Sequence, residues 1–277
     1  MKPRREIESV AWLLNEFSKK KTHPHVRYFY RGEAEQGHKL QPRLMRKKNV
    51  IASYSKLYSC STDCIVELQY ALLERFRRYA SSQNIGNAFF SSAGESPTLD
   101  EWLCIAQHHG LPTLLIDWSL QPLIGLYFSV RDTALHDKSG RFWYLKLKER
   151  KDRKGNTVRF RDKSGIKNGI LLADEEKDDD GLFVNKIDTP RVIVPWVFNK
   201  RIESQHARFT YSGRKYINMG FEDIEDELKP WEKLDWFEVP ADNKSQIKQD
   251  LEKLQIHEKT LFPDLDGLAR YLRDGGI

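Results

Sequence analysis

Apolar residues recur at helical spacing through the first half of the chain and again near its end. The predicted helices cover residues 6–17, 64–80, 98–109, 120–131 and 243–256. Thr98 is expected to cap the third of them, because Glu101 follows three residues later and completes a capping box. Ser119 is the expected N-cap of the fourth, with Pro122 in its first turn.

Runs of β-branched and aromatic residues predict short strands, most of them in the second half. These strands are expected at residues 26–31, 113–118, 143–148, 169–173, 191–198 and 206–212. A polar linker around Pro230 is expected to join the last strand to the last helix. Long strand–helix alternation is absent, which argues against a doubly wound parallel sheet. The pattern therefore predicts an α+β fold, with a helix-rich N-terminal half packed on a mostly antiparallel sheet.

Composition narrows the class of protein. The chain has 277 residues, of which 39% are hydrophobic and 12% aromatic, and this excludes a disordered chain. No run of 18 apolar residues occurs, so neither a transmembrane helix nor a membrane partner is expected. The first ten residues do not form a secretory signal. With three cysteines there is no disulfide framework, and the expected location is the cytoplasm. The loops at 81–97 and 149–165 do not divide the chain, so one domain is expected over residues 1–277.

The positive charge is concentrated at one end of the chain. The formal net charge is +6, and residues 1–50 hold 13 Lys and Arg against 5 Asp and Glu. This excess fits three readings: a solvated surface, a footprint for nucleic acid, or a basic rim around an anionic small ligand. No RNA- or DNA-binding motif accompanies the charge, so the sequence leaves the three open.

Several common catalytic and metal-binding motifs are missing. The chain has no Walker loop, no dinucleotide glycine motif and no HExxH or GxSxG sequence. Cys60 and Cys64 lack a second ligand pair, so they are expected to be buried thiols rather than zinc ligands. His108 and His109 have no acidic ligand nearby in the sequence, and no metal is expected.

Three segments contain polar and charged residues that neither a buried core nor a turn requires. In the first, a predicted strand ends at Tyr30-Arg31-Gly32. A guanidinium at a strand end can grip a diphosphate, and a glycine allows close approach to the backbone. The alternative is that Arg31 pairs internally with a carboxylate, for which Asp117 is the obvious candidate.

The second segment runs from Ala106 to Ser119 and contains a helix end, a tight turn and a short buried strand. Asp117 follows three apolar residues in the sequence, so its carboxyl group is expected to find a partner or to stay protonated. Ser119 lies where the amides at a helix N-terminus attract anions, although both residues could simply cap the next helix. The third segment is predicted to place Glu203 and Gln205 on one face of a strand, where they could hold a ribose hydroxyl.

Four motifs in order resemble the FRG domain family over about residues 8–272. They are Tyr30-Arg31-Gly32, the block Ala106–Ser119, the block Gln205–Thr210 with Ala207 in place of the usual glycine, and the block Leu261–Ala269. Members are mostly bacterial and largely without an assigned function. Some accompany defence or toxin modules, so the resemblance implies an antitoxin or another defence component as a partner.

A second resemblance, to ADP-ribosyltransferases, rests on an aromatic-Arg-Gly strand, a Ser before a helix and a late strand bearing Glu or Gln. It implies NAD as substrate and a protein or nucleic acid as acceptor. Arg31 would hold the diphosphate, Ser119 would order Arg31, and Glu203 or Gln205 would bind the nicotinamide ribose. The remaining expected binding residues are Tyr28, Tyr30, Gly32, His108 and Trp118, with Asp117 among the catalytic candidates.

Two alternatives remain open at the level of sequence. The protein could bind a nucleotide or nucleic acid without catalysis, or it could be a nuclease or hydrolase that uses Asp117 with His108.

Overall fold

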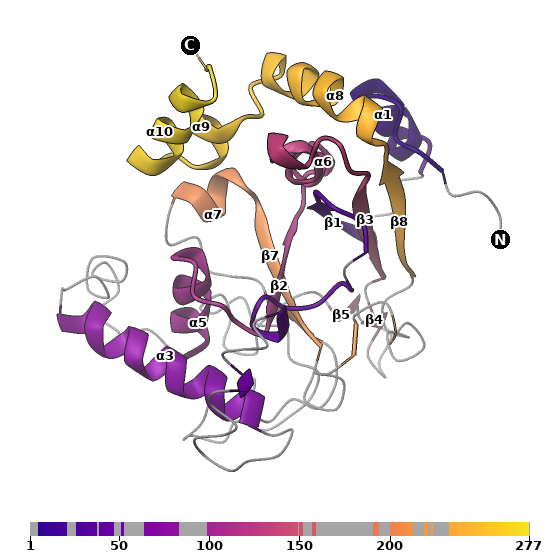
Figure 1. Ribbon diagram of the computed structural model, residues 1–277. Helices are drawn as coiled ribbons and strands as arrows, with labels where there is room; N and C mark the ends of the chain where they lie inside the picture. Colours follow the sequence, from indigo (N-terminus) through magenta and orange to yellow (C-terminus); the bar gives the residue numbers. More distant parts are fainter. Residues whose placement is uncertain are drawn as a thin grey trace.

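The computed structural model contains one six-stranded sheet in the order β6-β7-β2-β1-β3-β8, and every adjacent pair of strands is antiparallel (Figure 1). The structure describes residues 5–20, 26–37, 39–46, 51–52, 64–82, 99–148, 150–151, 157–158, 191–193, 200–212, 219–220, 223 and 233–276. The strands are β1 (Val26–Glu33), β2 (Leu115–Ser119), β3 (Gly140–Lys148), β6 (Arg191–Ile193), β7 (Ala207–Tyr211) and β8 (Lys233–Val239), with a separate small pair, β4 (Arg150–Lys151) and β5 (Thr157–Val158). These pairings confirm the α+β class.

Helices form a second layer in two groups (Figure 1). One group consists of α3 (Cys64–Ser82) and α5 (Leu99–His108), and the other of α1 (Val10–Ser18), α6 (Pro122–Val130) and α8 (Ala241–Lys253). The short helix α7 (Lys200–Ser204) precedes β7, and α9 (Glu258–Leu261) and α10 (Leu265–Arg273) close the described chain.

The strand register shows that both helix groups cover the same face of the sheet. Residues directly opposite on paired strands share a face, and alternate residues lie on opposite faces. Tyr30 lies opposite Ser119, and Asp117 lies opposite Phe209. Tyr30 packs in the cluster that contains α1, α6 and α8, while Phe209 packs in the cluster that contains α3 and α5. Ser119 and Asp117 therefore lie between the two helix groups.

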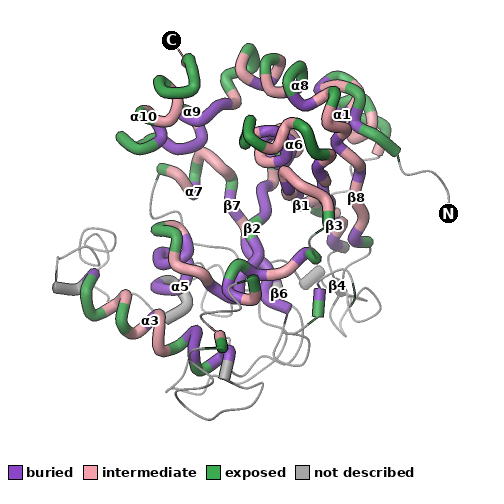
Figure 2. Tube along the Cα trace, in the orientation of Figure 1, coloured by how far each residue is buried: buried purple, intermediate pink, exposed green. Residues whose placement is uncertain are grey.

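The other face is covered differently. Its buried side chains form an aromatic and aliphatic cluster, and Leu40 from the segment after β1 packs into it. The cluster consists of Phe29, Leu40, Ile116, Trp118, Trp143, Leu145, Leu147, Val192 and Leu234. In Figure 2 the central strands are mostly buried, and exposed segments lie mainly on the outer surfaces of the helices. Because one face is filled by side chains, an open site on this sheet has to lie on the helix side.

Most predicted elements are present, with shifts at their ends. α1 begins later than predicted, because Ser9 is its N-cap and Ile7 instead donates its backbone N–H to Glu238 of β8. Ser119 is not the N-cap of α6; Gln121 takes that position, and Pro122 stands in the first turn as predicted. Of the strand predicted over residues 191–198, the described part is β6.

Two predictions were wrong. The polar linker predicted around Pro230 gives way at Lys233 to β8, which pairs with seven residues of β3 and buries Phe237. The pattern was missed because charged residues alternate with the apolar ones on this edge strand. In addition, Glu203 is not on a strand: it lies on α7, and β7 begins only at Ala207. The strand at 169–173, the cap at Thr98, the side chain of Glu101 and the pair Cys60 and Cys64 lie outside the described residues and side chains.

Gly32 is required by packing between β1 and α6. A Cβ atom there would lie 2.2 Å from the carbonyl oxygen of Gly125 and 2.3 Å from the backbone nitrogen of Ser129. Both neighbours are backbone atoms of α6, which cannot move aside as a flexible side chain would. The close approach that the sequence suggested for a ligand is thus made by a helix.

Replacing Gly32 with Ala should therefore destabilise the fold. We expect Gly32→Ala to lower the free energy of unfolding by about 3 kcal/mol or more, because α6 would have to separate from the sheet. Gly37→Ala is the matched control: it has a φ of 107° but no atom within 4 Å of an added Cβ, so only a backbone cost of roughly 1–2 kcal/mol is expected. Urea unfolding measures both. A Gly32→Ala variant no less stable than the control would contradict this account.

Candidate functional site

A pocket of about 940 Å³ lies between the two helix groups, above the ends of β1 and β2. The strands contribute Arg31, Asp117 and Ser119 to its wall, and α5 and α7 contribute Gln107, His108, Arg201 and Gln205. α6 and the C-terminal helices contribute Tyr127, Phe128, Arg131, Lys248, Glu252, Glu258, Arg270, Tyr271 and Arg273. This volume lies in the usual range for small-molecule sites.

The pocket carries an excess of positive charge. Seven Lys and Arg residues line it against five Asp and Glu residues. Several of these acids are already engaged: Glu258 with Arg131 and Arg270, Asp274 with Arg273, and Asp132 with a backbone N–H of the following turn. These pairings neutralise cations and acids alike, so the pocket lining keeps an excess of two positive charges, which favours an anion.

Arg31 connects β1 to β2. Only one residue pair, Tyr30 and Ser119, joins these two strands in register. Beyond that pair, the Arg31 guanidinium donates to the carbonyl oxygen of Asp117 at 3.0 Å and lies 3.7 Å from its carboxylate. The internal pairing that the sequence left open is therefore present, and Arg31 also lines the pocket.

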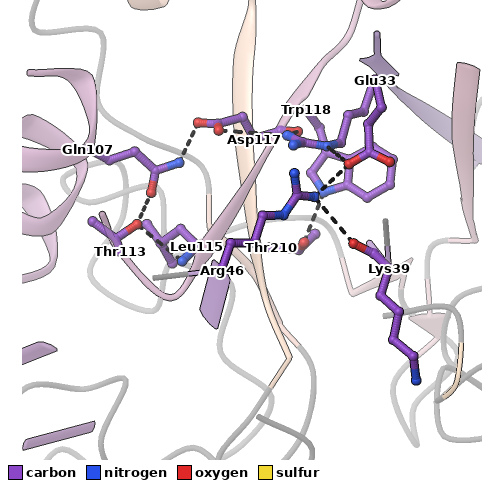
Figure 3. Close-up of polar contacts among 10 residues, drawn as sticks. Glu33, Lys39, Arg46, Gln107, Thr113, Leu115, Asp117, Trp118 and Thr210 are labelled. Atoms are coloured by element: carbon purple, nitrogen blue, oxygen red, sulfur yellow. Dashed lines mark hydrogen bonds and ion pairs between the residues drawn. The ribbon is translucent and has the colours of Figure 1, made fainter. Parts of the chain in front are cut away.

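Asp117 has partners, as the sequence predicted, but its carboxylate faces the pocket. Its side chain is 51% exposed, because it projects from β2 into the gap between the helix groups. Its other oxygen accepts a hydrogen bond from the Gln107 amide, whose oxygen in turn accepts from the Thr113 hydroxyl (Figure 3). Arg31 and Gln107 together fix the orientation of this carboxylate.

Glu33 holds the other side of this network. Its carboxylate is buried and accepts from Arg46 at 2.7 Å (Figure 3). It also accepts from the indole nitrogen of Trp143 at 3.0 Å. Arg31 lies 3.7 Å from the same carboxylate. Arg31 is thus held between two acids, which leaves it less available to a ligand than the sequence suggested.

Ser119 ties β2 to the turn before β7. Its hydroxyl donates to the carbonyl oxygen of Gln205 at 2.7 Å and accepts from the backbone nitrogen of Gln121 at 3.0 Å. Gln205 donates from its side-chain amide to the carbonyl oxygen of Leu261 at 2.9 Å. Ser119 and Gln205 therefore lie together, as expected, but their hydrogen bonds join parts of the fold.

His108 lies at the end of α5 beside Arg201. Burial, together with the positive charge of Arg201, lowers the pKa of His108 to about 4. Its imidazole is neutral at physiological pH and has the base strength of a carboxylate, well below the value that suits a general base. This environment weakens the hydrolase reading that paired His108 with Asp117.

Three arginines surround a single buried ring on the C-terminal wall. The guanidinium carbons of Arg131 and Arg201 each lie 4.5 Å from the centroid of Phe262, and that of Arg270 lies 5.2 Å from it. Phe262 is 2% exposed. The sequence singled out the block Leu261–Ala269 as a motif, but it gave no reason to join that block to arginines far away in the chain.

Glu258 holds two of these arginines. Its buried carboxylate accepts from Arg131 at 2.5 Å, from Arg270 at 2.7 Å and from the Tyr127 hydroxyl at 2.7 Å. Burial by itself would raise the pKa of Glu258, but the Tyr127 hydroxyl and the two guanidiniums outweigh it and hold that pKa below its ordinary value. The carboxylate is therefore ionised in the folded protein and fixes α9 and α10 to α6.

Of the remaining predicted site residues, Tyr30, Gly32 and Trp118 line the pocket, whereas Glu203 and Tyr28 do not. Glu203 is exposed on α7 and does not line the pocket. Tyr28 is not among the pocket-lining residues, and the buried Tyr30 packs against Phe17. Trp118 is buried, and its indole nitrogen donates to the Thr210 hydroxyl at 2.9 Å. Among the residues that the structure describes, no cluster of His, Cys, Asp and Glu could hold a metal ion.

The pocket lies on the helix-covered face of the sheet of an α+β fold. Residues 26–138 match the family model of the FRG domain. The matched segment holds the Tyr30–Gly32 and Ala106–Ser119 motifs, while the two later motifs lie beyond it. Searches of curated proteins and of solved structures found no match. No helix in the described part of the chain has the length and apolar composition needed to cross a bilayer.

The Glu258 cluster predicts a specific dependence of stability on pH. We expect Glu258→Gln to lower the free energy of unfolding by about 2–3 kcal/mol at neutral pH, because two arginines lose their charged partner. The loss is modest because these arginines are 36% and 32% exposed. Since the folded pKa of Glu258 lies below its usual 4.5, the stabilisation is present above that pH and is lost as the pH falls through the folded pKa.

The difference between wild type and Glu258→Gln should therefore shrink below about pH 4. Urea unfolding at a series of pH values measures it, and Glu203→Gln, on the exposed surface of α7, is the control. A difference that grows on acidification would contradict this account of Glu258.

Proposed function

We propose that the pocket binds a small phosphorylated nucleotide. The observation that carries the proposal is the cationic excess of the pocket, concentrated in arginines that come from four separate parts of the chain. Arginine presents a planar fork that matches phosphate oxygens, and it is enriched where phosphate is recognised.

The shape and the aromatic residues of the pocket favour a nucleotide over inorganic phosphate. A pocket of about 940 Å³ is much larger than a phosphate ion. Phe128 lines it and is only half-buried, so its ring is accessible to a planar base, and Tyr271 lines the same wall. A base stacks on such a ring regardless of its hydrogen-bonding pattern.

A panel of ligands tests the proposal. We expect isothermal titration calorimetry to detect binding of at least one of ATP, ADP, ADP-ribose or NAD, with an affinity that falls as salt rises. Phe128→Ala should weaken it by about 10-fold, since stacking of a base on an aromatic ring contributes about 1–3 kcal/mol. Tyr70→Ala is the control, because Tyr70 is an aromatic on α3 outside the pocket. No binding by any of the four would refute the proposal.

A second candidate is chemistry on the bound nucleotide, with NAD as the substrate and the acceptor a protein or a nucleic acid. Its support is Asp117, a carboxylate in the pocket that accepts a hydrogen bond from Gln107 and lies 3.7 Å from the Arg31 guanidinium. In such a transfer the bond from ribose to nicotinamide breaks, and positive charge develops on the ribose. A fixed carboxylate stabilises that charge. In this proposal Asp117 takes the role that the sequence analysis gave to Glu203 or Gln205.

The transferase candidate predicts turnover that depends on Asp117. Nicotinamide release from labelled NAD should fall at least 100-fold in Asp117→Asn, which removes the negative charge, while NAD binding persists. Glu252→Gln is the control, because Glu252 is another acid of the pocket. Nicotinamide release that survives in Asp117→Asn would refute this role. Binding of NAD without any release would leave the nucleotide-binding proposal standing alone.

A further inference from the structure

The C-terminal wall of the pocket places three guanidiniums around the buried ring of Phe262. They come from distant parts of the chain: Arg131 follows α6, Arg201 lies on α7, and Arg270 lies on α10. All three also line the pocket. Like charges repel one another, so their gathering costs stability unless acids or a ligand offset it.

The acids in the structure offset only part of this charge. Glu258 supplies one negative charge to Arg131 and Arg270 together. In the described part of the chain, Arg201 has no carboxylate within ion-pair distance; its guanidinium donates to the carbonyl oxygen of His108 at 3.1 Å. Among the described residues and within ion-pair distance, the three guanidiniums therefore exceed the carboxylates by two charges, and Asp117 and Asp264 act on Arg201 only from farther away.

Most hydrogen-bond donors of the cluster remain for a ligand. A guanidinium has five N–H groups, and among the described residues each of the three arginines uses one of its nitrogens in a hydrogen bond. Burial lowers the pKa of Arg201; the charges of Asp117 and Asp264 raise it, and those of Arg131 and Arg270 lower it. An anion at this position would satisfy both the charge and the donors.

We propose that Arg131, Arg201 and Arg270 form the diphosphate subsite of the pocket, and that the ligand is a nucleoside diphosphate or a dinucleotide joined by a diphosphate. This inference rests on the proposed nucleotide function. Two linked phosphates carry the two negative charges that the cluster lacks, and they offer enough oxygens to accept from three forks. The subsite thus lies on the C-terminal wall, whereas Arg31, which the sequence analysis gave this role, is held between Glu33 and Asp117.

Arg201 is the residue with which to test this subsite, because no carboxylate among the described residues depends on it. Titration calorimetry with the full chain compares inorganic phosphate, pyrophosphate, ADP and NAD. We expect pyrophosphate to bind more tightly than phosphate. Arg201→Gln should weaken binding of pyrophosphate and of the nucleotide by about 10- to 100-fold, since one charge-assisted hydrogen bond contributes about 1.5–3 kcal/mol.

Two further variants separate charge from geometry. Arg201→Lys retains the charge but loses the fork, so an intermediate loss is expected. Arg43→Gln removes an exposed cation from the same pocket, away from Phe262, and should change the affinity by less than about 3-fold. Equal losses in Arg43→Gln and Arg201→Gln would overturn the subsite, since they would reflect only the overall charge.

A measurement on the wild-type protein guards against a variant that does not fold. Phenylglyoxal modifies accessible arginines, and mass spectrometry identifies the modified positions. We expect saturating pyrophosphate to slow modification of Arg201 at least 5-fold and to leave Arg43 unchanged. Modification of Arg201 at the same rate with and without pyrophosphate would overturn the subsite.

The outcomes distinguish this inference from the proposed function. Nucleotide binding that is insensitive to Arg201→Gln refutes the subsite and leaves the nucleotide function standing. Pyrophosphate binding that depends on Arg201, without binding of any nucleotide, supports the subsite and refutes the nucleotide function. If neither pyrophosphate nor a nucleotide binds, both are wrong.

Discussion

The pocket depends on the buried carboxylate of Glu258. It accepts hydrogen bonds from Tyr127 and Arg131 on the α6 side and from Arg270 on α10, so it joins the C-terminal helices to the helix that packs against the sheet. Burying a carboxylate is costly unless charged and hydrogen-bonded partners surround it, and here three do. Without this contact the two arginines would lack a partner, and no other ion pair among the described residues would hold α9 and α10 over the opening between the helix groups.

The contact with Glu258 also brings the cations Arg131 and Arg270 close to each other. Two arginines share one acid, and Arg201 joins them at Phe262 without an acid among the described residues. Such a concentration of like charge opposes folding, and proteins commonly accept this cost at a binding site. Among the described residues, one carboxylate lies within ion-pair distance of the three guanidiniums, and the proposed diphosphate subsite rests on this observation.

Local patterns predicted much of the fold and part of the site. Periodicity predicted α1, α3, α5, α6 and α8, the strands β1, β2, β3 and β7 and the α+β class, because burial on one face imposes it. It did not predict the helices α7, α9 and α10. β8 was missed, since an edge strand with polar alternate residues resembles a linker. The exposure of Asp117 follows from the strand register and from the gap between the helix groups. The three apolar residues before Asp117 in the sequence reveal neither of these features. The arginine cluster joins residues up to 139 positions apart, Arg131 and Arg270, so no local motif could show it.

The Arg-Gly pair in β1 has a physical role that differs from the one its chemistry first suggests. Gly32 allows α6 to approach the strand, because any side chain would meet the backbone of α6. Arg31 donates to β2 where the two strands share only one residue pair, and it orients Asp117 by the same contact. Gly32 thus sets the position of α6, and Arg31 completes the connection between β1 and β2. Both residues line the pocket, and because their contacts serve the fold, the proposed recognition of a diphosphate rests on the arginines around Phe262.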